Sequence, residues 1–255
     1  MTAYVENFAD ALPSKERIAE VRKELEDAGV EYVLSSWIDL FGIPKTKPVP
    51  MSDFEQLCMG KGPQFAVHSI SFVPELSPAD SDQVMVPDLD AVYICPWDNT
   101  MAIIFADLFW EDKPYNVCPR QALKRAIAEA KKAGYVGYAG IEPEFIAMRH
   151  DDKGRPVKAI DDDPANGLRP RRQAFGYDVE QTIDSMDFLK DLIDIHEEMG
   201  WNMHDVVAEG AYSQFELDFH YTGNGRPLRI PAHSAEGSRQ GPRHVHHLHA
   251  QAHHR

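Results

Sequence analysis

The sequence contains only three cysteines, Cys58, Cys95 and Cys118, in a chain of 255 residues. Their odd number and wide spacing exclude a disulfide framework and do not match the paired spacing of a zinc or redox motif. No stretch approaches the roughly 18 continuous apolar residues of a membrane-spanning helix. The N-terminus also lacks the basic-then-apolar order of a signal peptide. We therefore expect a soluble protein of the reducing cytoplasm that has no membrane partner.

Basic residues are also scarce, with 26 Lys and Arg against 41 Asp and Glu and a net charge of -15. This balance argues against a nucleic-acid partner, because neutralising phosphates requires clustered Lys and Arg side chains. Hydrophobic residues make up 43% and charged residues 26% of the chain, which is typical of a globular protein. The length is sufficient for two domains of ordinary size.

The N-terminal part of the chain begins with a predicted helix over residues 14–29. Ser14 is placed to cap this helix, and Gly29 follows its end. Residues 30–112 are mainly β-structure, with two extended runs that turn between Asp39 and Gly42. Three prolines in the second run favour an edge position in the sheet, because proline cannot donate to a strand ladder.

The C-terminal part, residues 115–222, alternates helices and strands and predicts the beginning of an α/β domain. The expected elements are a helix over 118–134 with Leu123, Ile127 and Ala130 on one face, a strand region over 135–150, a helix over 179–200 and β-structure over 206–221. The whole chain is therefore predicted to have an α+β fold.

Two pairs of glutamates stand out in the second part. Glu142 and Glu144 are two residues apart on a predicted strand, so both side chains point to one face of the sheet. Glu209 and Glu216 are separated by a possible turn at residues 212–213, and Gln214 shares a strand face with Glu216. The four carboxylates can converge at one end of the sheet.

Oxygen-only ligands of this kind suit Mg²⁺ or Mn²⁺ rather than zinc. Two such ions can clamp a nucleotide phosphate and orient the attacking group, so the pairs indicate phosphoryl transfer. Each pair taken alone is also compatible with a solvated acidic face, since the protein is acidic throughout. Periodicity does not decide between the two interpretations.

These segments resemble the glutamine synthetase family over most of residues 15–222. GIEPEF, which contains Glu142 and Glu144, is similar to the family's G-x-E-x-E-F strand, and EGAYSQFE resembles its later E-x-x-x-x-Q-x-E segment. WIDLFGIPKTKPVP resembles the family's N-terminal β-grasp pattern. So does SDQVMVPDLD, with Ser81, Asp82, Pro87 and Asp88.

The resemblance implies a β-grasp domain over residues 30–112 and a partial catalytic domain over residues 115–222. It implies that Glu144, Glu209 and Glu216 hold the metal ion that organises glutamate and the acyl phosphate, and that Glu142 serves the nucleotide-side ion. The implied reaction uses ATP to phosphorylate the γ-carboxylate of glutamate, and ammonia or a small amine then displaces the phosphate. Intact relatives are expected to form homo-oligomeric rings.

One departure from the family pattern bears on the substrate. Ammonia-using members carry F-D-G-S-S-I in the β-grasp domain, and the nearest segment here is FAVHSI, with Ala66 at the Asp position. Loss of that carboxylate favours an alkylamine ligase, although an aspartate elsewhere can substitute for it. Because the family's K-P-x-x-G and later arginine motifs are absent, we expect the 255-residue chain to be inactive. The alternative class is a non-enzymatic remnant that binds a metal or a partner.

Residues 223–255 differ in composition from the rest of the chain. They contain seven of the twelve histidines, five arginines, one glutamate, no lysine and no aromatic residue. A permissible codon choice for this stretch, read one base later, encodes an amphipathic helix, a strand and the K-P motif with which the family continues. We therefore interpret residues 223–255 as an out-of-frame, disordered tail. The alternative is a natural basic tail.

Overall fold

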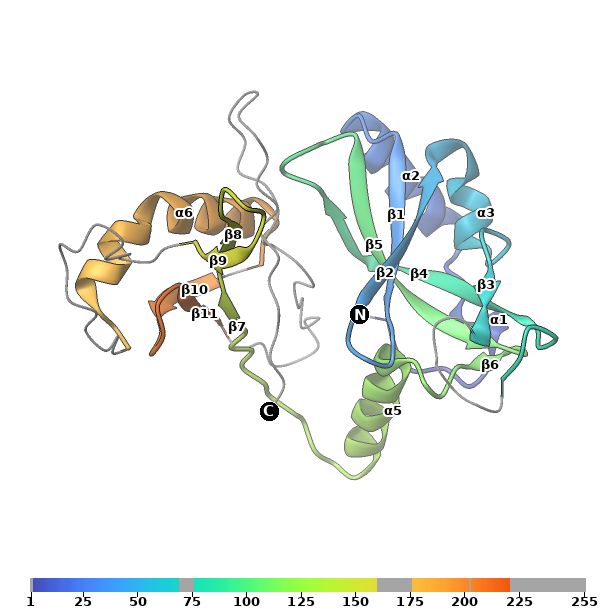
Figure 1. Cartoon of the computed structure of the whole chain (residues 1–255). Helices are drawn as coiled ribbons and strands as arrows, with labels where there is room; N and C mark the ends of the chain where they lie inside the picture. Colours follow the sequence, from blue (N-terminus) through green and yellow to red (C-terminus); the bar gives the residue numbers. More distant parts are fainter. Residues whose placement is uncertain (1, 69–75, 160–175, 202, 221–255) are drawn as a thin grey trace. The chain divides into compact units, whose positions relative to one another are not determined.

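The computed structural model describes residues 2–68, 76–159, 176–201 and 203–220 (Figure 1). The chain divides into two compact units, which meet in sequence between Gly137 and Tyr138. Both units combine helices and strands, which confirms the mixed α and β content expected from the sequence. The tail interpretation for residues 223–255 lies outside the described residues.

The N-terminal unit is built on a mixed sheet with the strand order β2-β1-β5-β4-β3, and β6 is added at β5. β1 is parallel to β5, and the other pairs are antiparallel. The strands are β1 (Tyr32–Ile38), β2 (Pro44–Pro50), β3 (Phe65–Ala66), β4 (Asp82–Ile94), β5 (Met101–Trp110) and β6 (Lys113–Pro114). β2 lies at an edge of this sheet, as its prolines predict.

Helix α2 of this unit begins and ends where local signals place it. Ser14 Oγ accepts a hydrogen bond from the Arg17 amide (3.1 Å) at the start of α2, and Gly29 has a φ of 84° after its end. This φ lies in the left-handed region that glycine adopts without strain. The helices are α1 (Phe8–Ala11), α2 (Lys15–Asp27), the 3-10 turn η1 (Met51–Asp53), α3 (Phe54–Cys58) and α5 (Pro119–Lys132).

One side of this sheet packs against α2 and α3. Val21 and Leu25 of α2 and Phe54 of α3 share a buried cluster with Val33 and Ile104 of the central strands. A second buried cluster continues along the sheet around Trp37, whose ring stacks on Phe65 with the centroids 4.3 Å apart. These two clusters form the hydrophobic core on the buried side of the sheet, to which alternate residues of each strand point.

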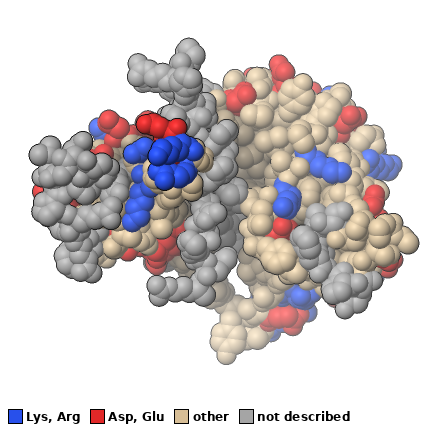
Figure 2. Space-filling view, in the orientation of Figure 1, with Lys and Arg blue, Asp and Glu red and all other residues tan. Residues whose placement is uncertain are grey.

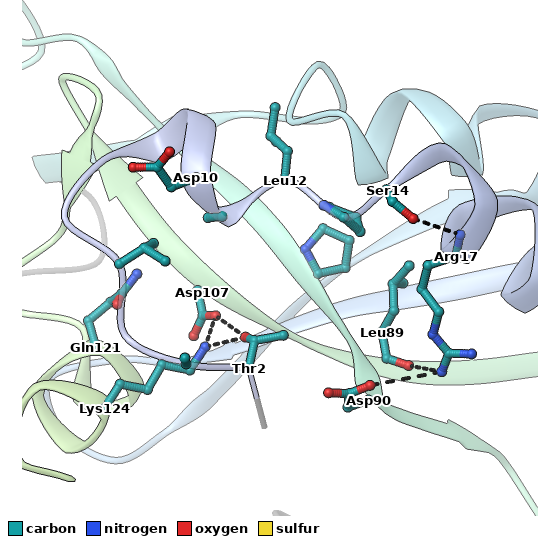
Figure 3. Close-up of a pocket in the computed structure, with 15 residues that line it drawn as sticks. Thr2, Asp10, Leu12, Ser14, Arg17, Leu89, Asp90, Asp107, Gln121 and Lys124 are labelled. Carbon is teal, nitrogen blue, oxygen red and sulfur yellow. Dashed lines mark hydrogen bonds and ion pairs between the residues drawn. The ribbon is translucent and has the colours of Figure 1, made fainter. Parts of the chain in front are cut away.

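Helix α5 is attached to the sheet through buried charges. Arg120 bonds Asp88 (2.6 Å) and Asp107 (3.1 Å), and Lys124 pairs with the second oxygen of Asp107. Thr2 joins this network through its amide, which donates to Asp88. Its hydroxyl accepts a hydrogen bond from Lys124 (Figure 3). Asp88, which the sequence placed in a β-grasp pattern, is therefore an anchor for α5.

Gln83 is fully buried next to the second cluster, and neither its amide nitrogen nor its amide oxygen has a hydrogen-bond partner in the described structure. An unsatisfied buried polar group costs about 1–3 kcal/mol. We expect Gln83→Met to raise the unfolding temperature by roughly 2–8 °C, because each kcal/mol shifts it by a few degrees in a chain of this size. Calorimetry would measure the change.

The matched control is Gln121→Met, because Gln121 is equally buried but its amide donates to the Leu108 carbonyl at 3.4 Å. This variant should not gain stability. If Gln83→Met lowered the unfolding temperature instead, the side-chain amide of Gln83 would have to form hydrogen bonds in the folded protein in solution.

The second unit contains a small antiparallel sheet with the order β10-β11-β7. Its elements are β7 (Glu144–Ile146), β8 (Met148–His150), β9 (Pro156–Lys158), α6 (Val179–Glu198), β10 (Met203–Ala208) and β11 (Gln214–Phe219), and β8 and β9 form a separate hairpin. Phe215 and Ala208 of the sheet pack against Leu189 of α6. Asp178 caps this helix by accepting hydrogen bonds from the amides of residues 180 and 181.

The strand region expected over residues 135–150 is shorter in the structure. Regular strand begins only at Glu144, and residues 131–140 are all exposed. The sequence alternates apolar and small residues there, and among residues 135–143 only Ala139 forms an isolated bridge in the described structure. A hydrophobic pattern forms a regular strand only where a neighbouring strand supplies hydrogen bonds along its length.

Candidate functional site

Three of the four predicted glutamates lie together on the small sheet. Glu144 of β7 and Glu216 of β11 are directly opposite in the antiparallel register. Opposite residues on neighbouring strands point to the same face. Glu209, which follows β10, shares a side-chain hydrogen bond with Glu216. The structure thus brings Glu144, Glu209 and Glu216 to one face of the sheet.

The alternation of β11 separates this acidic face from the core. Phe215 and Leu217 are buried, whereas Gln214, Glu216 and Asp218 between them are only partly covered. The core side contacts α6, so the opposite side is left for the carboxylates. The same two-residue period that predicted a shared face for Gln214 and Glu216 is therefore realised.

A tight turn positions Glu209 relative to Glu216. The Gln214 amide donates to the Ala211 carbonyl (3.0 Å), and the Glu209 amide donates to the Gln214 carbonyl (2.9 Å). Ser213 is fully buried and has a φ of 62°, a conformation that few non-glycine residues adopt. The turn expected at residues 212–213 is present, and it returns the chain so that Glu209 reaches β11.

Gln214 contributes to this face in a way that the sequence did not assign. Its side-chain Nε2 donates a hydrogen bond to Glu144 Oε2 at 2.7 Å. The bond holds one carboxylate oxygen of Glu144 in place. The signal was present in the Q-x-E spacing, which placed Gln214 on the correct face without giving it a partner.

Glu142 lies near the same edge but interacts with a different acid. The Leu217 amide donates to the Pro143 carbonyl (3.1 Å), so the backbone pairing continues past the end of β7. The pKa of Asp218 is raised, first by burial and then by the hydrogen bond and charge of Asp205. The charge of Glu142 adds a smaller contribution in the same direction. Glu142 is therefore electrostatically coupled to the acidic face at Asp218.

The accumulated negative charge changes the acidity of Glu216. Desolvation, the hydrogen bond with Glu209 and the charges of Asp218, Glu209 and Glu144 raise its pKa to about 7. Neighbouring ionised carboxylates repel one another, so the Glu216 carboxyl keeps its proton to a higher pH than an isolated glutamate does. A divalent cation would relieve the same repulsion.

We expect stability to fall as pH rises from about 4.5 to 7, because the native state holds the Glu216 proton through that window and the unfolded state does not. Glu216→Gln copies the protonated form and should remove this contribution. The variant should unfold at a higher temperature than the parent at pH 8 and at nearly the same temperature at pH 4. An equal difference in unfolding temperature between the variant and the parent at pH 4 and at pH 8 would contradict the raised pKa of Glu216.

His196 and His204 lie near this region of the chain but are not among the predicted metal ligands. His196 is fully buried, its Nδ1 bonds the Leu192 carbonyl (2.6 Å), and burial lowers its pKa. Its ring contacts Trp201 and Phe219, so it is a packing residue. His204 is exposed and bonds Asp205 at 2.7 Å.

The donor set fits a hard divalent cation, since every acidic group on this face offers oxygen. The geometry is incomplete, however. Within the described ranges, no three His, Cys, Asp or Glu side chains lie close enough together to hold a metal ion. The described residues of this face therefore do not form a complete metal site by themselves.

The N-terminal unit contains a cavity of about 300 Å³ between the first residues of the chain, α2 and α5. Arg17 and Lys124 line it, but Arg17 bonds the Leu89 carbonyl (3.0 Å) and Glu20, and Lys124 pairs with Asp107 (Figure 3). The cations of this cavity already have partners within the fold, so we assign it no ligand.

Comparison with known proteins identifies the family. The model of the glutamine synthetase catalytic domain matches residues 116–224. The chain is 31% identical over 195 residues to the glutamine synthetase of Rhizobium meliloti (strain 1021), a match that covers 76% of this chain and 42% of the relative. The chain belongs to the glutamine synthetase family.

Other family members give the same picture. The glutamine synthetase of Staphylococcus aureus (strain MW2) is 28% identical over 207 residues, which covers 79% of this chain and 44% of the relative. The solved structure of GmaS without ligand superimposes with a TM-score of 0.68 at 26% identity, over 79% of this chain and 45% of that one. The chain thus spans less than half the length of these glutamine synthetase relatives, and the matched catalytic segment includes all four glutamates.

No helix within the described ranges is both long enough and apolar enough to cross a membrane. The three cysteines are buried free thiols, and burial raises the pKa of each. They are therefore protonated and unreactive at neutral pH.

Proposed function

We propose that this chain carries the first part of an ATP-dependent ligase that joins glutamate to ammonia or a small amine through γ-glutamyl phosphate. The observation that carries the proposal is the acidic face. Glu144 and Glu216 lie opposite one another, Glu209 bonds Glu216, and all three occur in a segment that matches the glutamine synthetase catalytic domain. Membership of the family supplies the reaction class.

The roles of the glutamates follow the family pattern. Glu144, Glu209 and Glu216 would hold the Mg²⁺ or Mn²⁺ ion on the glutamate side, and Glu142 would serve the ion on the nucleotide side. Bound divalent ions neutralise phosphate charge during phosphoryl transfer. Gln214 would orient Glu144, because its amide holds one carboxylate oxygen at 2.7 Å.

The substrate amine is proposed from the N-terminal unit, which we interpret as a β-grasp domain. Ala66 ends β3 at the position where ammonia-using relatives have an aspartate, and its register partner in β4 is Asp82. A methyl side chain cannot accept a proton from ammonium. We therefore favour a small alkylamine such as methylamine as the nucleophile.

The 255-residue chain would not complete this reaction alone. The arginine motifs that neutralise phosphate in the family are absent from it, and the described carboxylates do not close a metal site. In intact relatives, we propose, a homo-oligomeric ring brings neighbouring subunits together. The buried free thiols support a reducing compartment such as the cytoplasm.

The open ligand set also favours a second candidate function, that of a non-enzymatic fragment that binds a divalent metal or a partner. The two candidates share the acidic face and differ in turnover. Metal binding is expected for both, and glutamate-dependent ADP release only for the ligase.

Mn²⁺ binding to the purified chain is the direct test of the acidic face. Electron paramagnetic resonance of free Mn²⁺ should show binding that Glu216→Gln weakens by more than about tenfold, since even outer-shell partners of ligands contribute 10–100-fold. Asp187→Asn, which removes an exposed acid from α6, is the charge-matched control and should bind as the parent does. Equal loss in both variants would mean that Mn²⁺ responds only to net charge.

A further inference from the structure

The turn between β10 and β11 determines where Glu209 lies. Two backbone hydrogen bonds close it, from the Gln214 amide to the Ala211 carbonyl (3.0 Å) and from the Glu209 amide to the Gln214 carbonyl (2.9 Å). Glu209 is the first residue of the turn, and its side chain bonds Glu216 across it. The position of the Glu209 carboxyl group therefore depends on how firmly the turn is held.

The surrounding backbone holds this turn in a strained conformation. The buried Ser213 has a φ of 62°, a conformation that a non-glycine residue keeps only when its surroundings impose it. Its carbonyl accepts a hydrogen bond from the Ala147 amide (2.8 Å). The Tyr177 amide donates to the carbonyl of Ala208 (2.7 Å), directly before Glu209. The segment that leads into α6 thus contacts the chain where the turn begins.

Gln181 of α6 adds a side chain to this support. Its Nε2 lies 3.3 Å from the Ala211 carbonyl oxygen and 3.4 Å from the Gln214 carbonyl oxygen. These are the same two oxygens that accept the backbone bonds of the turn. A carbonyl oxygen has two lone pairs and an amide nitrogen has two hydrogens, so Gln181 can donate one hydrogen to each oxygen while the turn stays closed.

The other end of the Gln181 amide shows that packing alone does not account for a glutamine at this position. The residue is 6% exposed, and its buried Oε1 has no hydrogen-bond partner in the described structure. A buried acceptor without a partner lowers stability, and a methionine of similar length would avoid that loss. What glutamine offers here and methionine does not is the pair of N–H donors to the turn.

The turn also contacts the β8–β9 hairpin, over which basic side chains gather in Figure 2. Lys158 Nζ of β9 lies 5.9 Å from the centroid of the Tyr212 ring. This distance is close to the limit of about 6 Å for a cation–π interaction. The contact reaches a side chain of the turn and not the carbonyls that close it, so Lys158 provides a comparison for Gln181.

We propose that Gln181 is a positioning residue of the acidic face, which holds the turn at Ala211 and Gln214 and so keeps Glu209 beside Glu216 for a shared divalent cation. The inference rests on the proposed function, since it extends the proposed cation site by one residue. Groups that orient metal ligands contribute to metal affinity although they do not touch the metal. Gln181 acts in this way through the backbone of the turn.

Amide hydrogen exchange, followed by NMR, tests whether Gln181 holds the turn. Gln181→Met removes both donors and also the unpartnered Oε1, so the unfolding temperature should change by no more than about 3 °C. Exchange of the Glu209 and Gln214 amides should become at least about fivefold faster, because the turn opens more often. The Leu217 amide, which donates to the Pro143 carbonyl (3.1 Å), is the internal reference and should be unchanged. Unchanged exchange at residues 209 and 214 overturns the proposal.

Mn²⁺ binding tests whether the held turn matters to the acidic face. Gln181→Met should weaken binding by about threefold to tenfold, less than the 10–100-fold of a group bonded directly to a ligand. Ser185→Ala is the matched control, since Ser185 is buried one turn further along α6 and its hydroxyl donates to the Gln181 carbonyl (2.6 Å). Neither Ser185→Ala nor Lys158→Met should weaken binding.

Faster exchange in Gln181→Met with the Mn²⁺ affinity of the parent would show that Gln181 only stabilises the turn, and it would overturn the proposal. Equal weakening of Mn²⁺ binding in Ser185→Ala would do the same. Failure of the parent chain to bind Mn²⁺ would contradict the proposed function, and the exchange rates of the Glu209 and Gln214 amides would still decide whether Gln181 holds the turn.

Discussion

Arg120→Met is expected to destabilise the N-terminal unit by about 3–5 kcal/mol, the cost of removing one partner from a buried charge network. The side chain of Asp88 is fully buried and that of Asp107 is 7% exposed, and both bond the Arg120 guanidinium. Without Arg120, Asp88 loses its ion pair and keeps the backbone amides of Thr2 (3.1 Å) and Asp90 (3.2 Å) as hydrogen-bond donors. Urea unfolding followed by tryptophan fluorescence would measure the loss.

The matched control is Arg125→Met on the same helix, whose guanidinium bonds the Asn116 side chain at 3.0 Å and pairs with no carboxylate among the described residues. It should change stability by less than about 0.5 kcal/mol. Replacing Asp88 as well, in Arg120→Met/Asp88→Leu, should recover part of the loss, since the uncompensated carboxylate is then gone. If Arg120→Met behaved like Arg125→Met, the ion pairs would not anchor α5.

The same network has a pH signature. Burial, the largest influence, would raise the pKa of Asp88, but the charges of Arg120 and Lys124 and the Thr2 amide outweigh it, and the pKa is lowered. A lowered carboxyl pKa contributes stability that is present above pH 3.8 and is lost as pH falls through the folded value. This direction is opposite to that of Glu216.

Sequence patterns predicted those features that depend on a few neighbouring residues. The α2 cap at Ser14, its end at Gly29 and the edge position of β2 all follow from local chemistry. The face on which α5 packs did not follow. Leu123 and Ile127 have the spacing of a core stripe, but the energy of orienting this helix comes from Asp88 and Asp107, which lie far away in the sequence.

The candidate site shows the same division. The two-residue period of strands was enough to predict that Glu142 and Glu144 share a face of one strand and that Gln214 and Glu216 share a face of another strand. It did not specify that β7 and β11 are neighbours in a register that sets Glu144 against Glu216. It also did not give Gln214 its bond to Glu144, because that contact spans 70 residues of sequence. Pairing between distant strands is tertiary information.

The purified chain is expected to show no glutamate-dependent ADP release with Mg²⁺, ATP and either ammonia or methylamine. The electrostatic groups that stabilise the transition state are each worth about 10²–10³ in rate, and this chain lacks the family's arginine motifs while its carboxylates form an open set. Its rate should therefore lie more than about 10³-fold below that of the Rhizobium enzyme assayed in parallel.

The decisive comparison is between the parent chain and Glu216→Gln at the same protein concentration. ADP release that is equal in the two, or that does not need glutamate, would come from a contaminating ATPase. Release that needs glutamate and is abolished by Glu216→Gln would show that the acidic face of β7 and β11 suffices for phosphoryl transfer. In that case the second half of the domain would serve in binding and assembly, and the arginines that follow in relatives would be dispensable for the chemical step.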